Sequence, residues 1–164
     1  MDFFVRQMQA SDIQAVLTMQ TLVYPESLLE DADFYLNRLQ LSPNLCLVAE
    51  QRGLLIGYLI SYPWQIDYPP QLNEVLADIP TKANSWFVHD CAVIPQAQGL
   101  GVARGLLNKA EKNAREKQLS YASLVSLGQA VTYWQKQNYH FVEKNMGKKL
   151  ACYGDGAAYM YKKL

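Results

Sequence analysis

The feature that most constrains the fold is a strand that runs through a glycine-containing turn directly into a long helix. Residues 85–93, SWFVHDCAV, are rich in the apolar and aromatic side chains of a buried strand, and Pro95 ends it because proline cannot donate to a β-ladder. Residues 101–118 then place apolar side chains on one helical face and charged side chains on the other. A second strand pattern, YASLVSL, follows at 121–127. This order predicts two parallel strands joined by a right-handed crossover helix.

The other segments predict further strands and helices around this unit. Two strands should pair as a hairpin across the turn QRG at 51–53. The strand patterns lie at residues 3–8, 45–50, 54–62, 140–145 and 158–163, and the helical patterns lie at 12–24, 28–41 and 129–137. Residues 63–84 show little periodicity and contain several prolines, which favours a long surface loop. We expect one α/β domain over residues 1–164, with a mixed sheet and helices on both of its faces.

Composition argues against several classes of protein. Of the 164 residues, 50% are hydrophobic and 18% are charged, which suits one globular core. The 15 basic and 15 acidic side chains balance, so we expect neither nucleic-acid nor membrane binding. The N-terminal residues do not resemble a secretory leader, and no apolar run approaches the roughly 18 residues of a membrane span, so we expect a cytoplasmic protein. Neither of the 2 histidines has a partner at metal-ligand spacing, and we expect no metal.

The turn between the strand and the helix has the character of an anion site. Several backbone N–H groups from Gln98 onward have no partner inside the chain, because the strand has ended and the helix has not begun its hydrogen bonding. Glycine at Gly99 and Gly101 lets a phosphate approach the backbone. One interpretation is a dinucleotide site, but the fingerprint G-x-G-x-x-G requires a glycine where Arg104 stands. The other interpretation starts from QGLGVA at 98–103, which fits the pattern Q/R-x-x-G-x-G/A.

That pattern resembles the acyl-CoA motif of the GNAT superfamily of N-acyltransferases, and other segments resemble the same family in the same order. The family's fourth strand, its later F-Y/W-x-x-x-G-F/Y segment and its first strand and helix look like HDCAVIP at 89–95, TYWQKQNYHF at 132–141 and VRQMQASDIQAV at 5–16. Within the superfamily, the sequence is most similar to arylalkylamine (serotonin) N-acetyltransferases and their bacterial relatives, which share His89 and the entry PNLCLV at 43–48. The sequence departs from them at Phe87, where these enzymes typically carry a second histidine.

The resemblance implies a GNAT-type mixed, mostly antiparallel sheet in which the fourth and fifth strands are parallel and splay apart. It implies acetyl-CoA as cosubstrate, with the open strand edge binding the pantetheine arm and the glycine turn binding the pyrophosphate. The residues implied in cofactor binding are Cys91, Ala92, Val93, Gln98, Gly99, Leu100, Gly101, Val102, Ala103 and Trp134. The implied activity is acetyl transfer to an amine by direct attack, without a covalent enzyme intermediate.

The catalytic residues that the resemblance suggests are a base and an acid. His89 is the candidate base that takes a proton from the acceptor amine, directly or through a water. Strand alternation should turn Asp90 to the other face, where it has at most a supporting role. The family's usual acid, a tyrosine, is replaced by Trp134, whose indole N–H is too weak an acid for ordinary proton transfer. Tyr133 lies about 100 degrees away around the helix and should face elsewhere. Tyr153 is a substitute acid, and water is the alternative donor.

The acceptor is expected to be a small-molecule amine or an amine of a peptide or protein. The candidate acceptor-binding residues are Tyr24, Tyr62, Trp64, Tyr68 and Trp86. Several aromatic side chains in one cleft would favour an aromatic or apolar amine. A polyamine would need clustered carboxylates, and the 63–84 loop contains few acidic residues. The alternative function is a catalytically weak CoA-binding sensor or interaction module, because the usual acid is missing. We expect a monomer or a homodimer.

Overall fold

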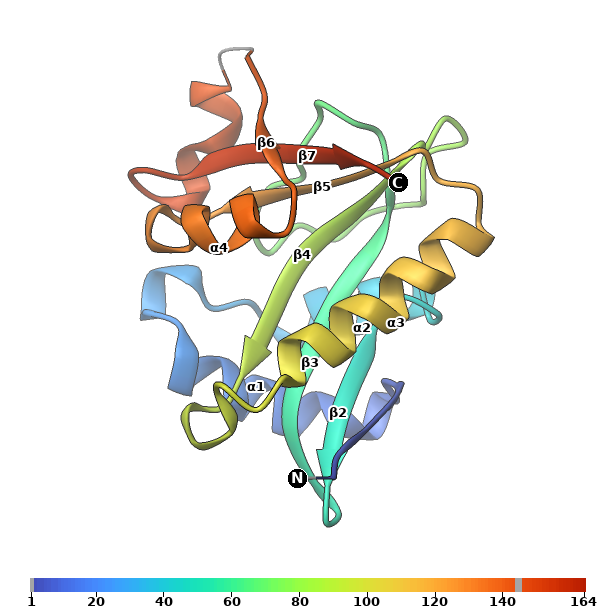
Figure 1. Ribbon diagram of the computed structural model, residues 1–164, viewed down its shortest axis with the longest axis vertical. Coiled ribbons are helices and arrows are strands. Elements are labelled where there is room, and N and C mark those ends of the chain that lie inside the picture. Colours follow the sequence, from blue (N-terminus) through green and yellow to red (C-terminus); the bar gives the residue numbers. More distant parts are fainter. Residues whose placement is uncertain (1, 144–145) are drawn as a thin grey trace.

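Figure 1 shows the computed structural model of the protein, which describes residues 2–143 and 146–164. These residues form a seven-stranded sheet in the order β1-β2-β3-β4-β5-β7-β6. Its strands are β1 (Phe4–Gln7), β2 (Leu47–Gln51), β3 (Leu54–Trp64), β4 (Ser85–Val93), β5 (Tyr121–Ser126), β6 (His140–Phe141) and β7 (Ala158–Lys163). Strands β4 and β5 run parallel, and all other neighbouring strands run antiparallel. The expected mixed, mostly antiparallel sheet with one parallel pair is confirmed.

Helices cover both faces of the sheet, as expected. The helices are α1 (Ile13–Val23), α2 (Ala32–Leu41), α3 (Val102–Glu116) and α4 (Val131–Lys136). In Figure 1, α3 crosses in front of the sheet, while α1 and α2 lie behind it. Apolar side chains of α1 and α2 form one core with β3 and β4, and α3 forms a second core on the opposite face. No helix within the described ranges is long and apolar enough to cross a membrane.

The C-terminal part of the chain differs most from expectation. Strand β6 is only two residues long, and residues 144 and 145 of the predicted strand at 140–145 lie outside the described part of the chain. Between β6 and β7 the chain forms a 3-10 helix, η5 (Gly147–Tyr153), which the sequence pattern did not predict. This helix carries Tyr153, the substitute acid expected from the sequence.

Strands β4 and β5 separate where they reach the candidate site. Their paired residues run from Ser85 with Tyr121 to Val88 with Leu124. Beyond this point β4 continues to Val93, and Figure 1 shows β5 and β7 turning away from it. Backbone groups along this edge of β4 therefore have no β5 partner. Its N–H groups are available to an extended ligand, while the carbonyl oxygens of Cys91 and Val93 accept from Tyr24 and Gln98.

The close packing of α3 on β3 depends on Gly57. A Cβ atom at this position would lie 2.9 Å from Val102 Cγ1 and 3.1 Å from the Ala92 carbonyl oxygen. We expect Gly57→Ala to lower the free energy of unfolding by about 1–3 kcal/mol, because the overpacked helix must shift. Urea denaturation measures this loss. The control is Gly128→Ala, whose Cβ would meet its nearest neighbour at 3.5 Å, an ordinary contact. Equal destabilisation by the two variants would contradict the packing explanation.

Candidate active site

A β-bulge in β4 places two adjacent side chains on the same face of the sheet. Ile60 of β3 pairs with Asp90 and Ser61 pairs with Val88, so His89 has no partner on β3. The side chains of His89 and Asp90 both contact α2. The expectation that Asp90 faces away from His89 is therefore wrong, because the extra residue of a bulge interrupts the alternation of the strand.

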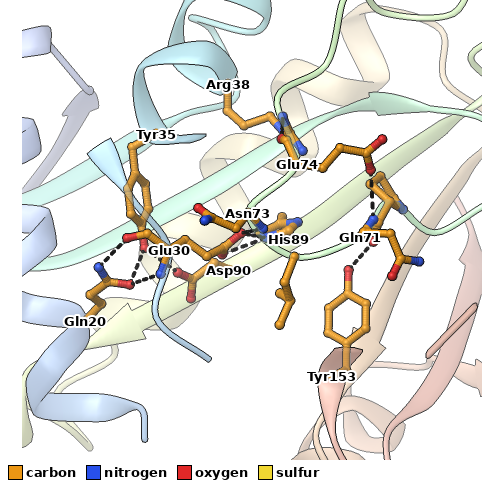
Figure 2. A network of polar contacts seen from close by, with 12 residues as sticks. Gln20, Glu30, Tyr35, Arg38, Gln71, Asn73, Glu74, His89, Asp90 and Tyr153 are labelled. Atoms are coloured by element: carbon orange, nitrogen blue, oxygen red, sulfur yellow. Dashed lines mark hydrogen bonds and ion pairs between the residues drawn. The ribbon is translucent and has the colours of Figure 1, made fainter. Parts of the chain in front are cut away.

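The His89 side chain is buried, and both of its ring nitrogens have partners. Nε2 lies 2.9 and 3.0 Å from the two carboxylate oxygens of Glu30, and Nδ1 lies 3.2 Å from the Tyr62 hydroxyl. The side chains of His89 and Glu30 are 0% and 4% exposed. Figure 2 shows the two side chains facing each other. Sequence analysis missed Glu30, which lies in irregular chain just before α2 and has no pattern around it that indicates a site.

Three hydrogen bonds hold Glu30 in place. Gln20 of α1 donates from Nε2 to the Glu30 carbonyl oxygen at 2.8 Å, and its Oε1 accepts from the Glu30 N–H at 3.0 Å. The Asn73 N–H donates to Glu30 Oε2 at 2.8 Å. Helix α1 and the loop between β3 and β4 thus fix the carboxylate against His89 from two sides. A carboxylate held in this way needs little reorganisation to receive a charged ligand.

Tyr62 supports His89 instead of lining a cleft. Its ring lies 4.7 Å from the guanidinium carbon of Arg38, and the ring of Phe34 lies 4.6 Å from the same carbon. Burial raises the pKa of Tyr62, so its hydroxyl stays protonated and available to His89. Tyr62 was an expected acceptor-binding residue, but it reaches the site only through His89.

Asp90 is a buried carboxyl group surrounded by tyrosine hydroxyls. Tyr24 and Tyr58 each donate to it at 2.6 Å, and Tyr35 donates at 3.5 Å. Burial raises the pKa of Asp90 above its ordinary value. Burial, and then the neighbouring carboxyl group, raise the pKa of Tyr24 as well. The Tyr24 hydroxyl also lies 3.3 Å from the carbonyl oxygen of Cys91, on β4.

A pocket of about 310 Å³ occupies the gap between β4 and β5. Its volume is typical of a small-molecule site. The walls come from the ends of β4 and β5, from α4 and the turn before it, and from the chain between α1 and α2. The lining residues are Val23, Tyr24, Pro25, Leu28, Glu30, Leu72, Val88, His89, Asp90, Cys91, Ala103, Leu124, Val125, Leu127, Gln129, Ala130, Tyr133, Trp134 and Tyr153. The pocket therefore joins the Glu30–His89 pair and the Tyr24–Asp90 pair to the open edge of β4.

The glycine turn after β4 fits an anionic ligand. Gly101 is the N-cap of α3, and Gly99 and Gly101 have φ angles of 79° and 81°, in the left-handed region that favours glycine. A Cβ atom at either position would meet nothing within 4 Å, so the space beside the turn is open. The N–H groups of Gln98 and Leu100, which were expected to have no partner, donate to the carbonyl oxygens of Pro95 and Ala97. The groups left for an anion are those in the first turn of α3, which have no acceptor inside the helix. These residues fit the pyrophosphate of CoA.

The other predicted cofactor residues divide between the pocket wall and the cores. Those that line the pocket are Cys91, Ala103 and Trp134. Those buried in the two cores are Ala92 and Val102, which leaves only their backbone groups for a ligand. Gln98 Nε2 donates to the Val93 carbonyl oxygen at 3.2 Å and joins the turn to the end of β4, while Leu100 is exposed. Burial raises the pKa of Cys91 to about 12, which keeps it a neutral thiol.

Two successive aromatic residues of α4 reach the pocket. Tyr133 lines it together with Trp134, so the expectation that Tyr133 faces elsewhere is wrong. Because the pocket borders the side of this short helix, residues about 100 degrees apart both reach it. The Trp134 ring packs edge-on against Tyr133 and Tyr139. Tyr133 remains 40% exposed, and partial burial raises its pKa.

Of the remaining predicted aromatic residues, one lines the pocket and the others lie in the core or elsewhere outside the pocket. Tyr153 lines the pocket, where its hydroxyl donates to the Pro70 carbonyl oxygen at 2.6 Å and burial raises its pKa. Trp86 lies in the core beneath α3, because alternation along β4 turns it to the face opposite the acceptor candidates. Trp64 lies outside the pocket, and its indole N–H donates to the Tyr68 carbonyl oxygen. Trp86, Trp64 and Tyr68 are therefore not part of this pocket.

The sequence matches the model of one protein family, and the fold is similar to that of several solved structures. The model of the family described as "Acetyltransferase (GNAT) family" matches residues 13–147. The structure is similar to Ard1 from Thermoplasma volcanium, with 14% identity, a TM-score of 0.78, and coverage of 100% of this chain and 99% of that chain. It is similar to the loading GNATL domain of CurA from Lyngbya majuscula, with 12% identity, a TM-score of 0.81, and coverage of 98% and 96%. It is also similar to the PaiA N-acetyltransferase from Thermoplasma acidophilum in complex with coenzyme A, with 15% identity, a TM-score of 0.65, and coverage of 100% of both chains. No curated protein matches the sequence.

Proposed function

Because the chain belongs to the GNAT acetyltransferase family, we propose that it moves an acetyl group from acetyl-CoA to an amine by direct attack. The observation that carries the proposal is one pocket in which the open edge of β4 meets the buried Glu30–His89 pair. The strand edge supplies binding groups for the acetyl donor, and the pair supplies a proton acceptor for the amine.

The cofactor half of the site consists mostly of backbone groups. The edge of β4 from His89 to Val93 would bind the pantetheine arm as an added strand would. The first turn of α3, beside Gly101, would bind the pyrophosphate. Acetyl-CoA supplies the activated thioester, and a backbone N–H near Ala92 would polarise its carbonyl group as negative charge develops.

The acceptor amine must lose a proton before it attacks. An alkylamine with a pKa near that of lysine, about 10.4, is almost wholly protonated at neutral pH. Both ring nitrogens of His89 have partners, and Glu30 lines the pocket with its carboxylate against His89 Nε2. The proton therefore passes to the Glu30–His89 pair, directly or through a water.

The chemistry of the pocket favours a small arylalkylamine, in line with the sequence resemblance. Aromatic side chains from α4, η5 and the end of α1 line it, and they suit an aromatic or apolar body. Carboxylates of the loop between β3 and β4 have other partners, since Glu74 accepts from the Gln71 N–H and Asp78 accepts from the Ile79 N–H. Among the described lining residues, Glu30 and Asp90 are the carboxyl groups that a polyamine would meet, and both already have partners in His89 and the tyrosine hydroxyls.

Thiol release from acetyl-CoA with a panel of amines tests the function. We expect turnover with 2-phenylethylamine and tryptamine, at a kcat/KM at least about tenfold above that for spermidine, because only the aromatic amines fill the apolar pocket. A peptide with a free N-terminus completes the panel. Tight CoA binding without thiol release for any amine would contradict the proposal and favour a CoA-binding sensor.

Ligand-induced thermal stabilisation tests the cofactor separately from the chemistry. CoA and acetyl-CoA should raise the unfolding temperature, because a ligand at about 100 times its Kd adds about 2.7 kcal/mol to native-state stability. NAD should have no effect, since Arg104 replaces the third glycine of the dinucleotide fingerprint. Stabilisation by NAD alone would contradict the assignment of the turn.

A further inference from the structure

Acetyl transfer requires a proton donor for the departing thiolate, and Trp134 is too weak an acid to supply one. We propose that the hydroxyl of Tyr24 is this donor and that the carboxyl group of Asp90 resupplies its proton. The inference rests on the proposed acetyl transfer and assigns a second pair of residues in the same pocket.

The position of Tyr24 connects the buried carboxyl group to the open strand edge. Tyr24 is the C-cap of α1 and lines the pocket. Its hydroxyl lies 2.6 Å from Asp90 Oδ1 and 3.3 Å from the Cys91 carbonyl oxygen, on the stretch of β4 that has no β5 partner. A thioester bound along this edge would pass the Cys91 carbonyl group that the Tyr24 hydroxyl contacts, and the same hydroxyl contacts the Asp90 carboxyl group.

The surroundings of Asp90 suit a group that stores a proton. Burial raises the pKa of Asp90, and the nearby Glu30 carboxylate acts in the same direction. The hydroxyls of Tyr24 and Tyr58 and the imidazole of His89 act in the opposite direction, but the balance remains upward. The Glu30 carboxylate contacts His89 directly, at 2.9 Å. Two pocket carboxyl groups in different surroundings can therefore take opposite tasks, one accepting a proton and one donating it.

The proton balance of the reaction requires both pairs. The ammonium group loses one proton to the Glu30–His89 pair before attack, and the nitrogen loses a second to water as the amide forms. The pair returns its proton to solvent after the reaction. The C–N bond forms and the C–S bond breaks, with the electron pair of the C–S bond remaining on sulfur. In the protonated form of Asp90, the carboxyl proton lies on Oδ1 and points to the Tyr24 oxygen, so the Tyr24 hydroxyl can protonate that sulfur and take the Asp90 proton in its place. Asp90 regains a proton from solvent after product release, so one proton is released overall and no redox partner is required.

Two other tyrosines line the pocket in the described part of the chain, and neither has this arrangement. The Tyr153 hydroxyl donates to the Pro70 carbonyl oxygen, which cannot return a proton. Tyr133 is 40% exposed on α4. Among these pocket tyrosines, Tyr24 is the one with a hydrogen bond to a carboxyl group.

The test begins with Tyr24→Phe, which keeps the ring and removes the hydroxyl. With acetyl-CoA and the best amine of the panel, we expect kcat to fall about 100-fold, within the usual range for general acid catalysis. The affinity for CoA, measured by calorimetry, should change by less than about threefold, because the hydroxyl acts in the transition state and not in binding.

Asp90→Asn tests the second member of the relay. The amide keeps one oxygen that can accept from a tyrosine hydroxyl but cannot supply a carboxyl proton. It should lower kcat without lowering CoA affinity, and the Tyr24→Phe/Asp90→Asn double variant should lose no more than the worse single variant. Tyr58→Phe removes an equally short bond to Asp90 from a residue outside the pocket, and it should lower kcat by less than about tenfold.

Several outcomes would overturn the inference. Undiminished kcat in Tyr24→Phe, with a wild-type protein that acetylates amines, would remove the relay and leave the proposed function intact. Fully additive losses in the double variant, or an equal loss in Tyr58→Phe, would show that the network only supports the fold. A 100-fold loss in Tyr133→Phe with an active Tyr24→Phe would assign the donor to α4. A wild-type protein that acetylates no amine would remove the proposed function itself.

Discussion

Replacing Gly101 with glutamate should weaken acetyl-CoA binding by about 100-fold or more. Gly101 caps α3, and the space beside its Cα atom is open. A glutamate side chain would bring bulk and negative charge to the N–H groups that the pyrophosphate should meet. Hydrogen bonds to charged groups contribute about 1.5–3 kcal/mol each, so the loss of two accounts for the effect. Calorimetric titration with acetyl-CoA measures it.

Gly53→Glu is the matched control for this variant. Gly53 lies in the turn between β2 and β3 with a φ angle of 79°, and a Cβ atom there also meets nothing within 4 Å. Both variants therefore introduce the same charge and a similar backbone strain. They should lose similar free energies of unfolding, and only Gly101→Glu should lose affinity. Equal affinity of the two folded variants for acetyl-CoA would show that the turn is not the anion site.

His89→Ala should lower the acetylation rate by about 100-fold or more near neutral pH and leave acetyl-CoA binding nearly intact. The substitution removes the partner of both Glu30 carboxylate oxygens. The deficit should shrink as pH rises toward the amine's own pKa, about 10.4 for an alkylamine, because the free amine then no longer needs the enzyme's base. Rates of thiol release from about pH 6.5 to 10 measure this dependence.

A second variant, His89→Gln, distinguishes a role of His89 in proton transfer from a role in stabilising the fold. His89→Ala removes one buried hydrogen-bond partner from Glu30 and one from Tyr62, which lowers stability. His89→Gln can still hydrogen-bond to both residues but cannot take a proton, so it should lose a similar fraction of the rate with a smaller loss of stability. If both variants lose the same fraction of activity at every pH up to the amine's pKa, His89 positions the substrate and is not the base.

The strand, turn and helix that we propose to bind the cofactor were predictable because neighbouring residues determine their structure. Strand β4 spans residues 85–93 as expected, and α3 buries the expected apolar stripe at Val102, Leu106, Leu107 and Ala110. The glycines of the turn have the backbone angles that their residue type suggests. In this unit the strand, the turn and the helix each carry their own local signal, and the parallel pairing of β5 follows from the short crossover.

The acceptor half depends on residues that are distant in sequence, and the sequence pattern could not show how they meet. Glu30 lies 59 positions from His89 and belongs to no periodic element. The bulge that turns Asp90 toward Tyr24 arises from the pairing of β4 with β3, and strand alternation alone gives the opposite face. Tyr153 reaches the pocket on a 3-10 helix held to Pro70, 83 positions away. Tertiary contacts decide all three placements.

A crystal structure with a bisubstrate analogue, in which CoA is joined through an acetyl group to 2-phenylethylamine, tests the central claim most directly. We expect the pantetheine arm along β4 from His89 to Val93 and the pyrophosphate on the N–H groups beside Gly101. The nitrogen of the analogue should lie within hydrogen-bond distance of Glu30, directly or through one water. An analogue bound outside the gap between β4 and β5, or one whose nitrogen points away from Glu30 and His89, would contradict the proposed acetyl transfer at this site.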